Sequence, residues 1–324
     1  MSQSLYFRGP LDTNSLSHLV LPSTLANRLS CSITQELGFE QNARVLIVHA
    51  DDLGLAHSVN EVTFTALEQS VITSAAVMVP CPWFPEVVEY TLQHDNTDIG
   101  IHLTLTSEWQ FYRWGPIAPR EEVPTLLDDD GYFHNNCSGL LRKATVEHVE
   151  IEVRAQIDRA LSAGIRPTHI DTHMLCLFQS AELYTVLLNI SKDYDLPCLT
   201  IPSSHRCKNG HQAVDGIIMA NEHVSPAGWQ TFYALALESL QPGIHELVVH
   251  LGSDDAELRA ITVGHPHWNA SWRQRDLDFI HSPRFKSALA NSRIHLTGWR
   301  AVRRALRTLR TRQQGRESHI EQHD

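Results

Sequence analysis

Short β-branched runs alternate with segments whose apolar residues recur at helical spacing, and this alternation constrains the fold most strongly. Helical spacing occurs in five segments: 59–67, 84–92, 146–161, 183–190 and 229–240. Strand-like runs lie around them: 44–50, 71–79, 99–105, 168–172, 198–201, 247–251 and, more weakly, 294–296. Strands that alternate with helices pair mostly in parallel and are covered by those helices. About seven strands predict an α/β chain with a single closed or nearly closed β/α barrel, and an open doubly wound sheet is the alternative.

The two ends of the chain do not follow this alternation. Residues 1–40 are poor in acids and show little periodicity, which predicts a leader that could be mobile, with a targeting peptide as the alternative. Residues 41–300 contain the expected barrel. Residues 301–324 continue an arginine-rich helical pattern, which predicts a solvated basic helix or tail rather than a nucleic-acid or membrane contact.

Composition excludes several classes of protein. A chain of 324 residues with 42% hydrophobic content can bury a full core. Its formal charge of -11 disfavours nucleic-acid binding, and no window approaches the ~20 apolar residues that a membrane span requires. Six cysteines without a CxxC pair predict reduced thiols and a cytoplasmic protein, although a disulfide stays open.

Acidic and imidazole side chains stand at the ends of predicted strands. Asp51 and Asp52 follow the run 44–50 directly, and a glycine comes two residues later. His102 lies in the run 99–105, and His250 lies in the last strong run. Because parallel strands end at one rim of a barrel, these side chains are expected to meet there. Each of these features has a structural alternative: the aspartate pair could simply form a turn, and His102 could be a buried core histidine.

The segment 167–174 (PTHIDTHM) carries the most specific pattern. His169, Asp171 and His173 alternate along one strand, so their side chains share a face. One carboxylate and two neutral imidazoles can hold a divalent cation and leave room for water and substrate. A second carboxylate beside the first can then act as general base. If His173 is a ligand, Asp171 or His169 could orient the ligands.

Four blocks of the chain together form a distinctive set: HADDLG (49–54), VITSAAVMVP (71–80), IGIHLTLTSEW (99–109) and PTHIDTHM (167–174). They resemble the blocks of the YdjC family of carbohydrate deacetylases, which includes the chitooligosaccharide deacetylases. The resemblance extends from about residue 44 to residue 299. It implies a β/α barrel of the polysaccharide deacetylase type and hydrolysis of an N-acetyl group from an amino sugar. It also implies one divalent ion, magnesium by resemblance, while Zn, Co or Mn would suit the same ligands.

The resemblance also implies roles for individual residues. Asp51 aligns with the family's catalytic base, and Asp52, His102 and His173 align with its metal ligands. His250 takes the place of a histidine that would protonate the leaving amine. The chain departs from the family after the ligand His173, where Met and Leu replace a run of histidines. A second histidine run at 265–267 competes with His250 for the acid role.

Residues 108–139 are rich in Pro, Trp, Tyr, Gly and Asp and predict a long loop that shapes the substrate pocket. We expect Trp109, Trp114 and Asp171 to contact the sugar, with loop anchoring as the alternative for the two rings.

The predicted function is removal of an N-acetyl group by metal-bound water, with Asp51 as base. A hydrolase of another amide, an ester or a phosphoester, and a non-catalytic sugar-binding descendant, are the alternatives. The expected partner is a small carbohydrate, without nucleic acid or membrane, and a homodimer stays open.

Overall fold

The computed structural model of the protein describes residues 28–200 and 213–320, so the expected leader up to residue 27 lies outside it. The strands within these ranges are β1 (Arg44–Leu53), β2 (Ser74–Val77), β3 (Ile99–Leu103), β4 (Ile170–Thr172), β5 (Gly216–Ile218), β6 (Gly243–Val249) and β7 (Ile294–Thr297). The α-helices are α1 (Arg28–Glu36), α2 (His57–Glu68), α3 (Phe84–Gln93), α4 (Cys137–Lys143), α5 (Val146–Ser162), α6 (Ala181–Asp193), α7 (Trp229–Glu238), α8 (Ala256–Ile261), α9 (Ala270–His281), α10 (Pro283–Asn291) and α11 (Trp299–Ile320). Short 3₁₀ turns are η2 (Pro124–Leu126), η3 (His173–Phe178) and η4 (Pro226–Gly228).

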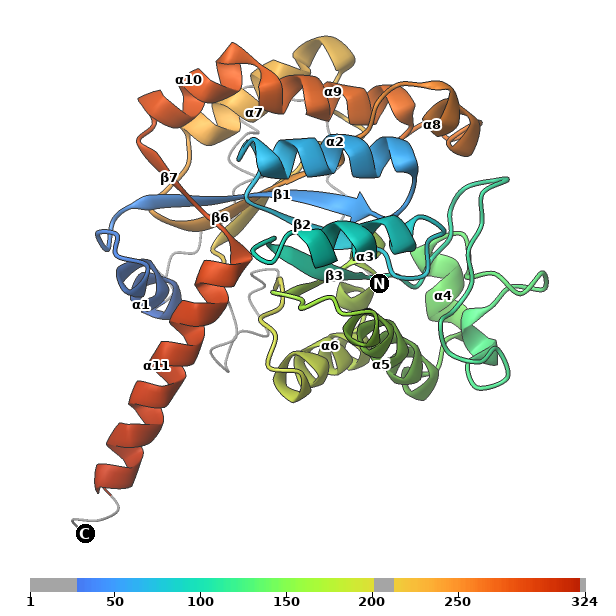
Figure 1. Cartoon of the computed structure of the whole chain (residues 1–324), viewed down its shortest axis with the longest axis horizontal. Coiled ribbons are helices and arrows are strands. Elements are labelled where there is room, and N and C mark those ends of the chain that lie inside the picture. The colour runs from blue at the N-terminus through green and yellow to red at the C-terminus, as the bar shows by residue number, and fades with distance from the viewer. Residues whose placement is uncertain (1–27, 201–212, 321–324) are drawn as a thin grey trace, which may run out of the picture.

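The strands form one parallel sheet in the order β4-β3-β2-β1-β6-β5. Strand β7 pairs with the first half of β1, and β2 pairs with its second half. Helices α7, α9 and α10 lie on one side of β1 and β6, and α5 and α6 lie on the other side of the molecule (Figure 1). No pairing joins β4 to β5 in the part of the chain that the structure describes, so the strands form a half-barrel. The predicted α/β class and parallel barrel arrangement are confirmed.

Many helices begin at a residue whose side chain accepts a hydrogen bond from a backbone N–H of the first turn. Asn136, Thr145 and Ser180 cap α4, α5 and α6 in this way. Asn269 and Ser282 cap α9 and α10. Such a cap stabilises a helix by about 1 kcal/mol, because it satisfies a donor that has no partner within the helix. These caps fix where the covering helices begin.

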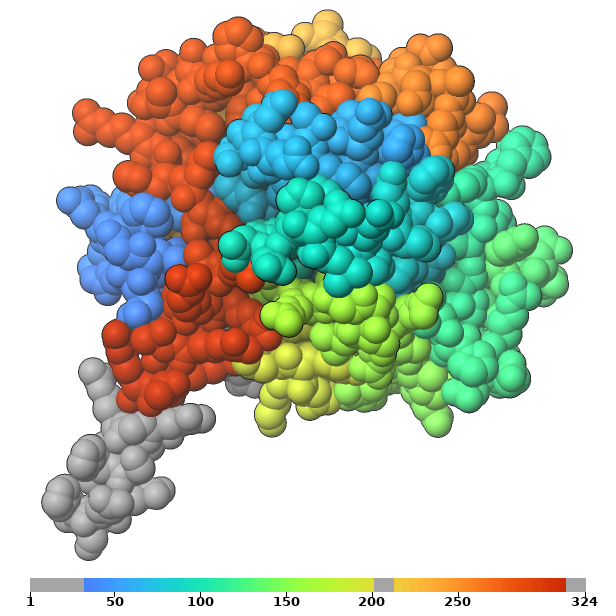
Figure 2. Space-filling model, in the orientation of Figure 1, coloured from blue at the N-terminus to red at the C-terminus, as the bar shows by residue number. Residues whose placement is uncertain are grey.

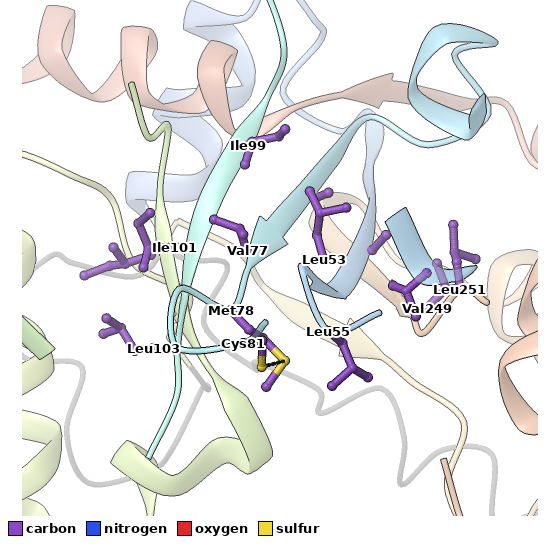
Figure 3. Close-up of a cluster of buried hydrophobic side chains, with 14 of the residues drawn as sticks. Leu53, Leu55, Val77, Met78, Cys81, Ile99, Ile101, Leu103, Val249 and Leu251 are labelled. Carbon is purple, nitrogen blue, oxygen red and sulfur yellow. Dashed lines mark hydrogen bonds between the residues drawn. The ribbon is translucent and has the colours of Figure 1, made fainter. Parts of the chain in front are cut away.

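Aliphatic side chains fill the space beneath the carboxyl ends of the strands. Leu53 of β1, Val77 of β2 and Ile101 of β3 belong to one buried cluster with Val249 and Leu251 of the β6 end (Figure 3). Burial of each such side chain contributes about 1.5–3 kcal/mol. The ends of β1, β2, β3 and β6 are therefore held in fixed relative positions, as a site built from them requires.

Some elements differ from the sequence-based expectation. The predicted strand 198–201 forms only a single bridge, between Cys198 and Ile170, and residue 201 lies outside the described part. Strand β5 was not predicted, because three residues are too few to show a period. Helix α11 crosses the expected boundary at residue 300, because Trp299 and Val302 are buried and the helix packs on the domain. Most of its arginines with described side chains also bond to the domain: Arg303 donates to the Pro167 carbonyl, and Arg307 and Arg310 pair with Asp195.

Cys137 and Cys176 form a disulfide, with their Cα atoms 5.5 Å apart. The prediction of reduced thiols is therefore wrong for this pair, and the inference of a reducing compartment loses its support. A sequence separation of 39 residues gave no spacing signal. Cys81 and Cys198 are free and buried, and Cys207 lies outside the described residues.

None of the helices in the described ranges is both long enough and apolar enough to cross a membrane.

Candidate metal and catalytic site

The ends of β1, β3 and β4 bring the three expected metal ligands together. The side-chain ligand atoms of Asp52, His102 and His173 lie within 4.8 Å of one another. Asp52 Oδ1 is 3.1 Å from His173 Nδ1 and 3.4 Å from His102 Nε2, and the two imidazole nitrogens are 3.3 Å apart. All three residues are buried. Three atoms at this spacing can hold one divalent cation.

The backbone turns sharply between the two aspartates. Asp52 has φ 67°, and the pairing of β1 with β2 shifts register between Ala50 and Leu53. Aspartate tolerates this left-handed conformation better than most residues. Consequently both carboxylates face the site although they are neighbours in a strand. The side chain of Asp51 is 15% exposed and that of Asp52 only 2%.

The environment of Asp52 fits a cation ligand. Its Oδ2 accepts a hydrogen bond of 2.6 Å from Arg273, whereas its buried Oδ1 accepts no hydrogen bond despite the two nearby imidazoles. Burial favours the neutral acid, but Arg273 and the imidazoles outweigh it and hold the pKa of Asp52 well below its usual range. An ionised oxygen that faces two imidazole nitrogens without a hydrogen bond matches the donor set of a metal site.

Each candidate histidine ligand is oriented by a carboxylate. His102 Nδ1 lies 2.6 Å from Asp171 Oδ1, and His173 Nε2 lies 2.9 Å from Glu108 Oε1. Metal-bound histidines usually hold such a partner on the other ring nitrogen, because it fixes the ring and its tautomer. Asp171 is buried behind His102. This position matches the orienting role rather than the expected sugar contact.

His49 connects Asp51 to Asp171, and the sequence predicts no role for it. Its Nε2 lies 3.0 Å from Asp171 Oδ2 and 3.2 Å from Asp51 Oδ1, and its Nδ1 lies 2.7 Å from Ser74 Oγ. Burial would lower the pKa of His49, but the carboxylates of Asp171, Asp51 and Glu246 raise it to about 10. The His49 ring is therefore protonated, and its Nε2–H can donate a hydrogen bond to Asp51 and to Asp171.

His250 is the histidine that lies beside the expected base. Its Nε2 is 3.8 Å from Asp51 Oδ2, and its backbone N–H donates to Asp276 Oδ2 at 2.8 Å. Burial lowers the pKa of His250, so the ring is neutral at neutral pH. The competing His265 instead faces Trp109, with ring centroids 4.9 Å apart.

A cavity of about 310 Å³ has Glu108, the partner of His173 Nε2, in its wall. Its other polar lining includes Gln110, Arg113 and Asn135. The cavity borders residues 108–139, which include η2 and the first residues of α4 and lie beyond the end of β1 (Figure 1). Figure 2 shows this green segment at the right-hand edge of the molecule. The expected pocket-forming loop thus has a cavity at its base.

The two tryptophans expected to stack on sugar are buried. Trp109 is 1% exposed and Trp114 is 3% exposed, and Trp114 Nε1 donates to the Thr106 carbonyl at 2.9 Å. Neither ring offers a free face for a pyranose. Their surroundings match the alternative of loop anchors.

The parallel half-barrel, with its carboxylate–imidazole cluster at the strand ends, has the architecture of a metal-dependent hydrolase. The family described as YdjC-like protein matches residues 45–291, and the chain belongs to this family. Among its relatives, a carbohydrate deacetylase of Thermus thermophilus is 33% identical over 276 residues, which are 81% of this chain and 95% of the relative. A carbohydrate deacetylase of Enterococcus faecalis is 36% identical over 47% of this chain and 56% of its own length. A solved structure from Enterococcus faecalis, described as a cellobiose-phosphate cleavage protein, is 26% identical with a TM-score of 0.68, covering 80% of this chain and 99% of its own.

Proposed function

We propose that this protein is a metal-dependent hydrolase that removes an N-acetyl group from an amino sugar or oligosaccharide. The observation that carries the proposal is the division of roles between two adjacent carboxylates. Asp52 is buried and faces two imidazoles, whereas Asp51 is more exposed and is held by His49. Membership of a family with named carbohydrate deacetylases supports the substrate class.

Asp52, His102 and His173 would hold the divalent cation, which supplies Lewis acidity toward the acetyl carbonyl and the attacking water. Magnesium is our first choice by family resemblance. Zn, Co and Mn are compatible with one carboxylate and two imidazoles. Asp171 and Glu108 keep the two rings in place during the reaction.

The remaining residues move protons. Asp51 accepts a proton from the attacking water, and His49 keeps its carboxylate in position. His250 is neutral before the reaction and takes up this proton across 3.8 Å, through a water molecule or a small side-chain rotation. It then donates the proton to the leaving amine nitrogen as the C–N bond breaks. The products are acetate and a free amino sugar.

We place the sugar in the cavity that Glu108 lines, since Glu108 connects this cavity to His173. Gln110, Asn135 and Arg113 offer hydrogen bonds to hydroxyl groups there. Trp109 and Trp114 contribute by anchoring the wall of the cavity rather than by stacking.

Acetate release from a panel of N-acetylated mono- and oligosaccharides tests the proposal. Metal-loaded wild type should release acetate, and Asp51→Asn should lower the rate about 10²- to 10⁴-fold at unchanged metal content, because the base is lost. Asp95→Asn, which changes an exposed aspartate away from the cluster, is the matched control. No acetate from any sugar with Mg, Mn, Co or Zn would contradict the proposal. The protein would then be screened against other amides and phosphoesters.

A further inference from the structure

The chain takes an unfavourable path directly after the candidate ligand His173. Met174 has φ 54° and ψ 17°, and Leu175 has φ 53° and ψ 27°. Two consecutive left-handed residues are disfavoured for L-amino acids, and neither side chain can form the local hydrogen bonds that help asparagine or aspartate there. Such a turn persists only when its surroundings hold both of its ends.

The surroundings do hold both ends. On one side His173 contacts Asp52 and Glu108. On the other side Cys176 is completely buried and is joined by the disulfide to Cys137, the first residue of α4. Cys137 Sγ also lies 3.3 Å from the Met174 carbonyl oxygen.

The same disulfide also anchors the 108–139 segment, which carries Glu108, the partner of His173. Glu108 begins the 108–139 segment, and Cys137 lies near its end. The Glu108–His173 contact and the disulfide therefore close a ring, in which both ends of the loop are attached to the segment that carries the ligand.

We propose that the Cys137–Cys176 disulfide is a positioning element of the metal site, which holds the left-handed Met174–Leu175 turn and so keeps His173 between Asp52 and Glu108. The inference rests on the proposed function, since it concerns the same site, but it predicts metal affinity rather than turnover. When the S–S bond is broken, the turn can relax toward ordinary backbone angles and His173 moves away from its partners. Cys137 is partly exposed, so a reductant can reach the bond.

Titration with Mn²⁺ tests this proposal, because a hard cation discriminates against the new thiolates as ligands. Wild type is titrated as the disulfide, and again after treatment with a phosphine, which becomes the phosphine oxide as the S–S bond becomes two thiols. The phosphine is removed before titration. Cys137→Ser is titrated beside them, and Cys198→Ser is the matched control for loss of a buried thiol. Circular dichroism confirms that each sample is folded.

We expect reduced wild type and Cys137→Ser to bind Mn²⁺ about 10- to 100-fold more weakly than oxidised wild type, as for other changes behind a metal ligand. Cys198→Ser should bind like oxidised wild type. Folded, reduced wild type that binds within twofold of the oxidised protein would overturn the proposal, as would alkylation showing that Cys137 and Cys176 are free thiols under oxidising conditions. If wild type binds Mn²⁺ in this disulfide-dependent way but releases no acetate, the proposed activity fails and the positioning role stands.

Discussion

At the scale of single residues, Asp51 and Asp52 show how adjacent identical side chains acquire different roles. The positive φ of Asp52 directs its carboxylate inward to Arg273 and the imidazoles. Asp51 stays nearer the solvent, between His49 and His250. The difference comes from one backbone angle and from partners that are distant in the sequence; Arg273 is 221 residues from Asp52.

The variant His49→Asn should lose the positioning of the Asp51 carboxylate while it keeps the bound metal ion. The shorter amide can still reach toward Ser74 but not toward both Asp51 and Asp171. The Asp51 carboxylate therefore loses the hydrogen bond that holds it in position. We expect the kcat for acetate release to fall about 10- to 100-fold, with one metal ion per chain retained. His94→Asn, at an exposed histidine, is the control. Unchanged kcat would argue against a role for His49.

Metal binding should release protons. Without the cation, nearby carboxylates outweigh burial and raise the pKa of His173 to about 9, and they raise the pKa of His102 as well. A ligand must be a neutral imidazole, so protons compete with the cation and affinity should increase as the pH rises toward about 9. Calorimetry at pH 7.5 in Tris and in Hepes measures the proton release from the difference in heat. Equal heats, once corrected for dilution, would contradict protonated ligands.

At the scale of elements, the end of β1 is the most constrained place in the fold. Gly54 has φ 89°, and a Cβ there would lie 3.1 Å from Val77 Cγ2 and 3.3 Å from the Met78 carbonyl oxygen. The glycine lets the chain leave the strand immediately after the two aspartates. The close approach to β2 then helps hold the register shift that exposes Asp51.

Gly54→Ala should destabilise the protein by more than Gly38→Ala. Both glycines have φ near 90°, so each alanine carries a backbone cost of about 1–3 kcal/mol, but only position 54 adds a clash, since nothing lies within 4 Å of a Cβ at position 38. Urea unfolding measures both free energies. Equal losses for the two variants would show that the contact with β2 can relax.

The candidate ligands could be predicted from sequence because they stand at the ends of strands, where position alone implies proximity. Position singles out Asp51, Asp52 and His102, and the alternation in 167–174 singles out His173; the resemblance to the YdjC family then predicts Asp51 as base and the other three as ligands. The residues around them could not be predicted in this way, because their contacts depend on how distant parts of the chain pack together. His49 lies inside an apolar run and resembles a core histidine. Arg273 is on α9, a helix whose pattern gave no signal.

At the scale of the whole molecule, the half-barrel places every candidate catalytic group at one rim. Helix α11 packs at β1 and β6, where Trp299 Nε1 donates to Glu246 Oε1 at 2.7 Å. The 108–139 segment lies beyond the arrowhead end of β1 (Figure 1), and the disulfide joins Cys137 of this segment to Cys176. The contacts of α11 with β1 and β6 are therefore separate from the 108–139 segment, for which we propose contact with the substrate.

The number of Mn²⁺ ions bound per chain in wild type, Asp51→Asn and Asp52→Asn distinguishes the roles proposed for the two aspartates. These two variants make the same chemical change at adjacent positions, and circular dichroism checks that Asp52→Asn, which also loses the buried pair with Arg273, is folded. We expect one ion for wild type and for Asp51→Asn, and loss of that ion in Asp52→Asn, because only the Asp52 carboxylate faces both ligand imidazoles, those of His102 and His173. Loss of the ion in Asp51→Asn, or its retention in Asp52→Asn, would contradict the division of roles between the two aspartates.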